Sequence, residues 1–386
     1  MDQHSGPRYQ CSSCNEEHPP TEWRCSCGAP LEFLETPLPD TPPPARPTAS
    51  NRAASRLDRD SGLWAFESFL PVERSVTLGE GFTPLIDAPD GDVTYKLEWL
   101  FPTGSFKDRG AAVTLSHAHN LGVERVVEDS SGNAGTAIAT YAARAGIDAE
   151  IFVPADANAG KLRAIERTGA TVRRISGTRQ DVTDACVAAL ESDSSAERTN
   201  TSGAWYASHA WNPAFFEGTA TFAYEIVAQR GWSVPDAVVT PLGHGTLFLG
   251  AYRGFERLSR AGWTDEIPRL YGVQAAGVAP VVSDRHGASA AEGANAIADG
   301  IQITAPVRRT QIHEALDTTG GDVLAVDADT TRAAYDRLHR QGFFVESTAA
   351  VGAAAYDELR SAGEIDADED VIVALTGTGK NETSTV

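Results

Sequence analysis

The sequence predicts an α/β protein with parallel sheets in two lobes and a small cysteine module at its N-terminus. From about residue 61 onward, strand-like segments alternate with helix-like segments, a pattern typical of parallel sheets. The chain has 386 residues, more than one ordinary domain requires. Four of its five cysteines lie within residues 11–27. We therefore expect a module, a linker and a two-lobed body.

The N-terminal module, residues 1–34, contains two closely spaced cysteine pairs. Cys11 and Cys14 form a C-x2-C pair, and Cys25 and Cys27 form a C-x-C pair. Four thiolates at this spacing suit one tetrahedral zinc ion. Two disulfides, which an oxidising compartment would favour, or a module without metal are the alternatives. No histidine marks an open coordination position, so the sequence predicts a structural zinc ribbon rather than a catalytic metal.

The segment of residues 35–60 is expected to be a linker. It overlaps the run LETPLPDTPPPARPTASNRAAS, residues 34–55, which is rich in proline and small polar residues. Deleting residues 1–55 is then expected to leave cofactor binding by the body intact. The fifth cysteine, Cys186, lies in a segment of helical periodicity and is expected to be a core residue.

The main body contains the alternating elements. Short apolar or β-branched runs predict strands at 125–130, 149–155, 171–176, 236–243, 269–275 and 370–377. Helical spacing of apolar residues predicts helices at 135–147, 158–170, 246–262, 330–342 and 347–363. We expect a large lobe of about 61–110 and 217–386 and a small lobe of about 111–216.

The chain is strongly acidic, with 53 Asp and Glu against 32 Lys and Arg and a formal net charge of −21. This charge repels nucleic acids and anionic membrane surfaces. Acidity combined with only four lysines favours adaptation to a salty cytoplasm, where salt screens self-repulsion; an ordinary acidic protein is the alternative. The chain starts without an apolar leader and contains no apolar run long enough for a membrane span. We therefore expect a cytoplasmic protein.

Lys107 is unusual in a chain whose other basic residues are almost all arginine. It lies in FPTGSFKDRGA, between a Gly-Ser turn and a run of helix formers. The start of a helix disfavours a cation because the helix dipole is positive there. The same field favours a neutral amine, which is a nucleophile and forms Schiff bases with aldehydes.

Three loops follow predicted strands, where ligands of open α/β sheets bind. In EDSSGNAGTA, glycines allow close backbone approach and Asn133 offers a donor and an acceptor. In ALTGTGKNE, the hydroxyl of Thr376 ends a strand. The third loop, in TPLGHGTLFLG, contains Gly243, His244, Gly245 and Thr246. Each loop alone could be a plain turn.

The loop of residues 243–246 leads into a predicted helix N-terminus, which favours an anion. It is not a dinucleotide fingerprint, because Phe248 stands where the third glycine would be, and no G-K-[ST] follows. A single phosphate is therefore expected. A phosphorylated aldehyde would use Lys107 for its carbon, this loop for its phosphate, and Asn133 and Thr376 for its ring. Pyridoxal 5'-phosphate has this chemistry.

Seven segments together resemble the threonine synthase family of fold-type II pyridoxal-phosphate enzymes. They are LGEGFTPL, KLEWLFPTGSFKDRGA, DSSGNAGTA, NPAFFEGTATFAYEI, PLGHGT, GFFVESTAA and LTGTGK. The resemblance covers nearly everything after residue 60, and the cysteine module is similar to the ribbon of some archaeal members. It implies a two-lobed fold-type II fold and a lyase that converts O-phosphohomoserine and water to threonine and phosphate.

The resemblance also implies roles for individual residues. Lys107 would form the Schiff base and remove the α-proton, Asn133 would bond the ring hydroxyl, residues 243–246 would hold the phosphate, and Thr376 would face the pyridine nitrogen. Substrate contacts are expected from the following serines and cations: Ser105, Ser130, Ser131, Ser347, Arg109 and Lys380. The expected partners are a small amino-acid substrate and a second copy of the chain.

Some positions depart from the family pattern. Phe215 and Phe216 stand where threonine synthases usually carry a phosphate-binding arginine, and Ala220 and Ala134 replace a lysine and a threonine. A serine/threonine dehydratase, or a β-replacement enzyme similar to cysteine or cysteate synthases, therefore stays open as an alternative. A non-enzymatic zinc-ribbon protein that binds nucleic acid is a third interpretation, which the acidity disfavours.

Overall fold

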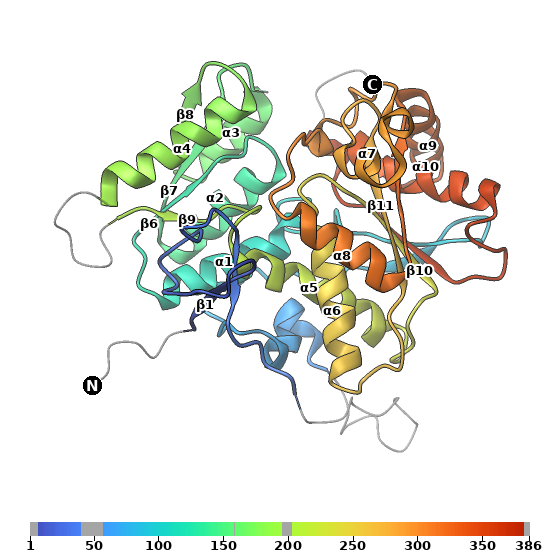
Figure 1. The fold of residues 1–386 in the computed structure, drawn as a ribbon, viewed down its shortest axis with the longest axis horizontal. Coiled ribbons are helices and arrows are strands. Elements are labelled where there is room, and N and C mark those ends of the chain that lie inside the picture. Colours follow the sequence, from blue (N-terminus) through green and yellow to red (C-terminus); the bar gives the residue numbers. More distant parts are fainter. Residues whose placement is uncertain (1–6, 40–56, 158, 195–202, 382–386) are drawn as a thin grey trace. The chain divides into compact units, whose positions relative to one another are not determined.

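The computed structural model describes residues 7–39, 57–157, 159–194 and 203–381 (Figure 1). The chain forms two compact units. Unit 1 comprises Met1–Leu38, Asp60–Glu80 and Lys107–Gly218, and unit 2 comprises Pro39–Arg59, Gly81–Phe106 and Thr219–Val386. The expected linker lies largely outside the described residues.

Unit 1 is built around a four-stranded parallel sheet. Its strands lie in the order β8 (Thr171–Ile175), β7 (Asp148–Pro154), β6 (Arg125–Glu128) and β9 (Trp205–Tyr206). Its helices are α1 (Lys107–Asn120), α2 (Asn133–Ala145), α3 (Ala159–Arg167) and α4 (Arg179–Ser194). The apolar face of α2 is buried, and Gly146 ends that helix in the left-handed conformation at φ 71°. Cys186 is fully buried in the core of this unit, as expected.

The cysteine module also belongs to unit 1. Strands β1 (Tyr9–Cys11), β2 (Glu17–His18) and β3 (Leu31–Phe33) form an antiparallel sheet in the order β2-β1-β3. Tyr9 is buried, and its hydroxyl lies 2.7 Å from Nε2 of His117 on α1. Burial lowers the pKa of His117 to about 3, so this histidine is neutral at pH 7. The proline-rich composition suggested an independent module, whereas the described ribbon residues pack tightly within unit 1.

Unit 2 is built around a six-stranded sheet. Its strands lie in the order β12 (Val323–Val326), β11 (Arg269–Ala275), β10 (Ala237–Pro241), β13 (Val371–Ala374), β5 (Thr94–Lys96) and β4 (Leu85–Asp87), and only the β4–β5 pair is antiparallel. Its helices are α6 (Thr246–Arg260), α7 (Pro280–His286), α8 (Arg309–Thr319), α9 (Ala328–Arg340) and α10 (Ser347–Ala362). Small side chains bring α10 close to the sheet, since a Cβ added at Gly352 would lie 3.0 Å from Val373 Cγ1.

Helix α5 (Pro213–Gln229) begins in unit 1 and ends in unit 2. The remaining described elements are η1 (Arg59–Phe69), which Gly62 interrupts with non-helical φ and ψ, and the short 3₁₀ segments η2 (Ala288–Ala291), η3 (Asp299–Ile301) and η4 (Gly379–Asn381). The expected strands and helices of the body are confirmed, with ends shifted by one or a few residues. Residues 61–80, which we expected in the large lobe, pack in unit 1 instead. In the described part of the chain, no helix has the length and apolar character needed to cross a membrane.

Candidate active site

Lys107 is the first residue of α1, and its position is fixed by close packing of α1 against the start of α5. A Cβ at Gly110 would lie 2.2 Å from the Phe215 ring, and a Cβ at Gly218 would lie 2.1 Å from the carbonyl oxygen of Arg109. Only glycine at both positions allows this approach. The Nζ atom of Lys107 lies 5.8 Å from the centroid of the Phe215 ring. The amine therefore has an aromatic face beside it.

The residues just before Lys107 pair with the segment that follows β13 in unit 2. The backbone N–H of Phe106 donates to the carbonyl of Thr376 over 3.1 Å, and Ser105 forms an antiparallel bridge with Gly377. The N–H of Thr378 donates to Gly104 over 2.9 Å. The structure thus places Ser105 and Thr376 on adjacent, paired segments of unit 2.

The loop after β6 closes on the first turn of α2. A Cβ at Gly135 would lie 1.8 Å from the carbonyl oxygen of Ser130, so glycine is required there. Ser130 is buried, Ser131 is partly exposed, and Asn133 is the first residue of α2. Gly132, at the N-cap, provides no side chain to cap the helix. This loop therefore presents small polar groups beside an uncapped helix start.

Two acidic residues at the end of β6 were not recognised from the sequence. The carboxylate of Glu128 is fully buried and lies 2.6 Å from Nδ1 of His209. Burial, followed by the charge of Asp129, raises the pKa of Glu128 well above its ordinary value. Asp129 accepts hydrogen bonds from Tyr206 over 2.9 Å and Thr183 over 2.6 Å. The sequence signal that could have identified them is a pair of adjacent carboxylates directly after the apolar residues of a predicted strand.

In unit 2, the loop of residues 243–246 joins β10 to α6. Gly245 occupies the N-cap of α6 at φ 80°, and no side chain caps the helix. The first residue of α6, Thr246, accepts a hydrogen bond at its carbonyl oxygen from the hydroxyl of Thr219 over 2.8 Å. A left-handed glycine followed by uncapped N–H groups is the arrangement that binds a phosphate.

The remaining expected substrate residues differ in accessibility. Ser347 begins α10, is buried, and donates to the carbonyl of Ile297 over 2.6 Å. Arg109 is completely buried in unit 1, whereas Lys380 is exposed in η4 of unit 2. Phe215 and Phe216 are also completely buried, and their apolar rings provide no cation for a phosphate.

The donor set fits pyridoxal phosphate. Ser105 Oγ is buried and has no hydrogen-bond partner among the described residues, and a buried unpaired hydroxyl is costly without a ligand. It stands two residues before the lysine. A primary amine suits an aldehyde, the 243–246 loop suits a phosphate, and the Thr376 hydroxyl suits a neutral ring nitrogen.

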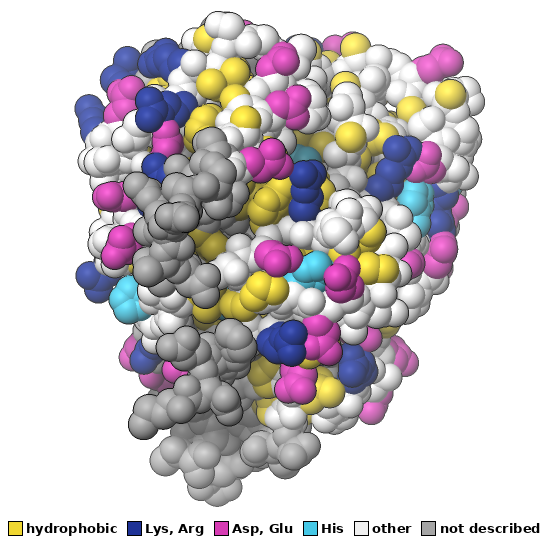
Figure 2. All heavy atoms as spheres, turned by 60° about the vertical axis from the view of Figure 1, so that its left-hand side comes forward, with side chains coloured by type: hydrophobic (Ala, Val, Ile, Leu, Met, Phe, Trp, Pro, Cys, Tyr) yellow, Lys and Arg dark blue, Asp and Glu magenta, His cyan; other side chains and the backbone are white. Residues whose placement is uncertain are grey.

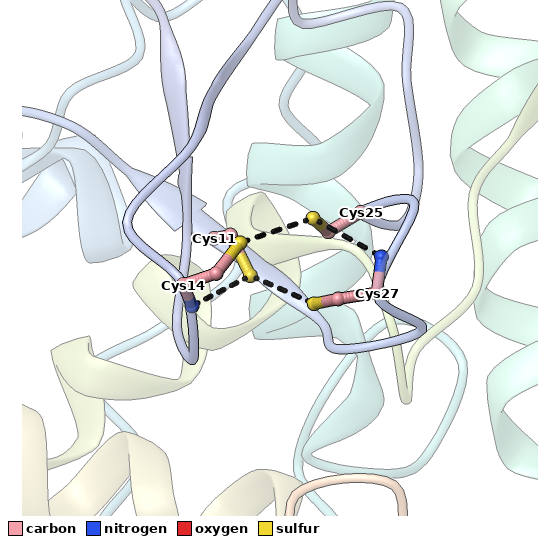
Figure 3. A group of neighbouring side chains, drawn as sticks. All are labelled: Cys11, Cys14, Cys25 and Cys27. Carbon is pink, nitrogen blue, oxygen red and sulfur yellow. Dashed lines mark hydrogen bonds between the residues drawn. The ribbon is translucent and has the colours of Figure 1, made fainter.

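The four ribbon cysteines point toward one another (Figure 3). The Cys11 and Cys27 sulfurs are 3.5 Å apart, as are those of Cys14 and Cys25, and all four lie within 4.8 Å of each other. Zinc–sulfur bonds of about 2.3 Å place tetrahedral sulfurs about 3.8 Å apart. No disulfide joins them. These thiols therefore fit one zinc ion.

Comparison with known proteins identifies the family of the chain. Residues 76–377 match the family model described as pyridoxal-phosphate dependent enzyme. The chain is 31% identical to threonine synthase of Methanocaldococcus jannaschii, over 96% of this chain and 92% of that protein. It is 34% identical to threonine synthase of Methanosarcina acetivorans, over 82% and 79%.

Solved structures show the same fold at low sequence identity. A processed form of threonine deaminase isoform 2 from Solanum lycopersicum has a TM-score of 0.65 at 19% identity, covering 91% of this chain and 92% of that one. Maize serine racemase has a TM-score of 0.64 at 20% identity, covering 77% and 88%. The chain therefore belongs to the pyridoxal-phosphate dependent enzymes, in the family that contains the threonine synthases.

Proposed function

We propose that this enzyme is a lyase that converts O-phosphohomoserine and water to threonine and phosphate. One observation carries the proposal: relatives that are threonine synthases align with up to 96% of the chain, including the segment in which Lys107 begins α1. Lys107, the 243–246 loop and Thr376 all lie within residues 76–377, which match the family model.

In the proposed mechanism, Lys107 binds the cofactor aldehyde and then acts as the base. When bound, pyridoxal phosphate withdraws electrons from the substrate and stabilises negative charge on its carbon atoms. The Lys107 amine takes the α-proton and returns protons to the carbon chain. Close packing at Gly110 and Gly218 limits the freedom of the lysine backbone. In net terms, the bond to the γ-phosphate breaks and water supplies the β-hydroxyl.

The other proposed contacts orient the cofactor and the substrate. Residues 243–246 hold the cofactor phosphate, Asn133 donates to the ring hydroxyl, and Thr376 faces the ring nitrogen with a neutral hydroxyl. The serines named above contact the amino-acid carboxylate. Lys380 is the proposed cation for the substrate phosphate, because it is exposed whereas Arg109 is buried.

A second candidate is a serine/threonine dehydratase, and a specific observation favours it. Phe215 and Phe216 are completely buried apolar residues in the segment where a phosphate-binding arginine is expected. A dehydratase releases water rather than phosphate and needs no such cation. A β-replacement enzyme acting on serine or O-phosphoserine would also tolerate this segment.

Purified holoenzyme should be assayed with O-phosphohomoserine, O-phosphoserine, serine and threonine in parallel. Release of inorganic phosphate from O-phosphohomoserine with formation of threonine supports the first proposal. Keto acid from serine or threonine, without phosphate release from O-phosphohomoserine, supports the dehydratase. Phosphate release from O-phosphoserine alone supports β-replacement.

We also propose that the four ribbon cysteines hold one structural zinc ion. Metal analysis of the purified protein should give one zinc per chain, and replacing Cys14 and Cys27 with serine should abolish it. We further propose a cytoplasmic, salt-adapted homodimer that binds neither nucleic acid nor membranes. The net charge of −21 supports the salt adaptation and the lack of affinity for nucleic acid and anionic membranes, and on the face in Figure 2 acidic side chains are interspersed with the basic ones. Sedimentation at molar KCl would establish the oligomeric state.

A further inference from the structure

The ribbon loop, residues 15–24 between the two cysteine pairs, contacts strand β9 of unit 1. Trp23 packs edge-on against Tyr206 and Trp211, with ring centroids 5.1 and 5.0 Å apart. Interplanar angles of 87° and 86° give the T-shaped geometry that aromatic pairs favour. Trp23 also contacts the core cluster that contains Tyr206.

A second contact joins the same two segments. The indole N–H of Trp205 donates to the carbonyl oxygen of Pro20 over 3.1 Å. β9 is a two-residue edge strand that pairs with β6 through Val126–Trp205 and Val127–Tyr206. A strand of two residues forms few backbone hydrogen bonds, so the contacts from the ribbon loop stabilise its position at the edge of the sheet.

Tyr206 connects this contact to the candidate active site. Its hydroxyl donates to Asp129 Oδ1 over 2.9 Å, and the hydroxyl of Thr183 donates to the other carboxylate oxygen over 2.6 Å. Asp129 is almost fully buried. It directly precedes Ser130 and Ser131, so its two hydrogen bonds hold the chain at the point where the loop leaves β6.

We propose that Trp23 is a positioning residue for the loop of residues 129–133. Trp23 holds the Tyr206 ring, the Tyr206 hydroxyl holds Asp129, and Asp129 sets the conformation of the serines and of Asn133. The inference rests on the proposed role of this loop in cofactor and substrate binding. Preorganised groups bind a ligand more tightly because less ordering is needed on binding, so support from outside the site matters.

Four variants of the full-length holoenzyme test this. Trp23→Ala removes the supporting ring, and Tyr206→Phe removes only the hydroxyl. Trp23→Phe is the conservative rescue. Phe33→Ala is the matched control, because Phe33 is a buried ribbon aromatic whose ring contacts Tyr9 and His117 rather than Tyr206. It reaches β9 only indirectly, through the contact of His117 with Trp205.

Hydrogen exchange of a peptide spanning residues 126–136 is the first readout. Trp23→Ala and Tyr206→Phe should each speed exchange in the loop about five- to tenfold, as loss of one hydrogen bond does. The same variants should weaken pyridoxal phosphate binding, measured by absorbance titration, or raise KM by a similar factor, with kcat less affected. Trp23→Phe should restore most of the loss, and Phe33→Ala should exchange like the wild type in this peptide.

Two results would overturn the proposal. One is unchanged loop exchange in Trp23→Ala. The other is an equal increase in Phe33→Ala, which would show general support by the ribbon rather than positioning by Trp23. Exchange and cofactor titration use no amino-acid substrate. They therefore test the inference even if O-phosphohomoserine proves not to be the substrate.

Discussion

Gly218 offers the sharpest test of how the fold positions Lys107. In Gly218→Ala, the new Cβ would lie 2.1 Å from the carbonyl oxygen of Arg109, whereas ordinary contact begins at about 3.4 Å. The oxygen belongs to the backbone of α1 and cannot rotate away, so α1 and α5 must separate by about 1 Å. Overpacking of this kind lowers the free energy of unfolding by about 1–3 kcal/mol.

The same separation moves Lys107, two residues before Arg109. A shift of about 1 Å in a reacting group costs about 100-fold in kcat. The measurements are a denaturant titration for stability and steady-state kinetics for kcat. Gly203→Ala is the matched control, because a Cβ there meets nothing within 4 Å. If Gly218→Ala matched Gly203→Ala in both stability and kcat, glycine packing would not position the lysine.

The remaining predictions concern single groups and the surface charge. Borohydride reduction and peptide mapping should place pyridoxyl on Lys107; an adduct on Lys96 would defeat the assignment. Lys380→Ala should raise KM for the phosphorylated substrate about tenfold, as loss of a charge-assisted contact does, and leave the cofactor spectrum unchanged; an unchanged KM contradicts its role. The pKa of His117 is lowered from 6.5 to about 3, so the unfolded chain binds a proton that the folded chain does not, and stability falls as pH drops from 6.5 toward 3. In His117→Gln, the slope of the free energy of unfolding against pH in this range should be smaller by about 1.4 kcal/mol per pH unit, measured by denaturant titration. The melting temperature should rise from low to molar KCl, since salt screens the net charge of −21; no rise would contradict salt adaptation.

Features of the site that depend on local backbone chemistry could be predicted from the sequence. The loop of residues 243–246 could be recognised because glycines between a strand and a helix allow the backbone N–H groups to approach an anion closely. The helix start at Lys107 and the strand before Asn133 followed from the same local signals and are confirmed. The roles of these residues stay predictions.

Features that depend on contacts between distant segments could not be predicted. β9 and β5 have two and three residues, too short for a periodicity to emerge. The pair of Glu128 and His209 joins residues 81 positions apart. Proline-rich composition suggested a detached ribbon, but a linker's composition says nothing about the aromatic faces that Tyr9 and Trp23 bury in unit 1.

The scarcity of lysine gains a physical explanation from Lys96. Its ammonium group is fully buried and donates to Thr83 O, Glu225 and Gln229 over 2.7, 2.9 and 2.9 Å. These three acceptors match the three N–H bonds of a compact ammonium, which the planar fork of arginine would not fit. For Lys107 we propose a different property, the nucleophilic amine that arginine lacks. In surface pairs such as Arg285–Asp317 and Arg332–Asp329, the cation is arginine. Lys96 is therefore a site where the compact ammonium group itself is required, and Lys107 is proposed as a site where the amine is required.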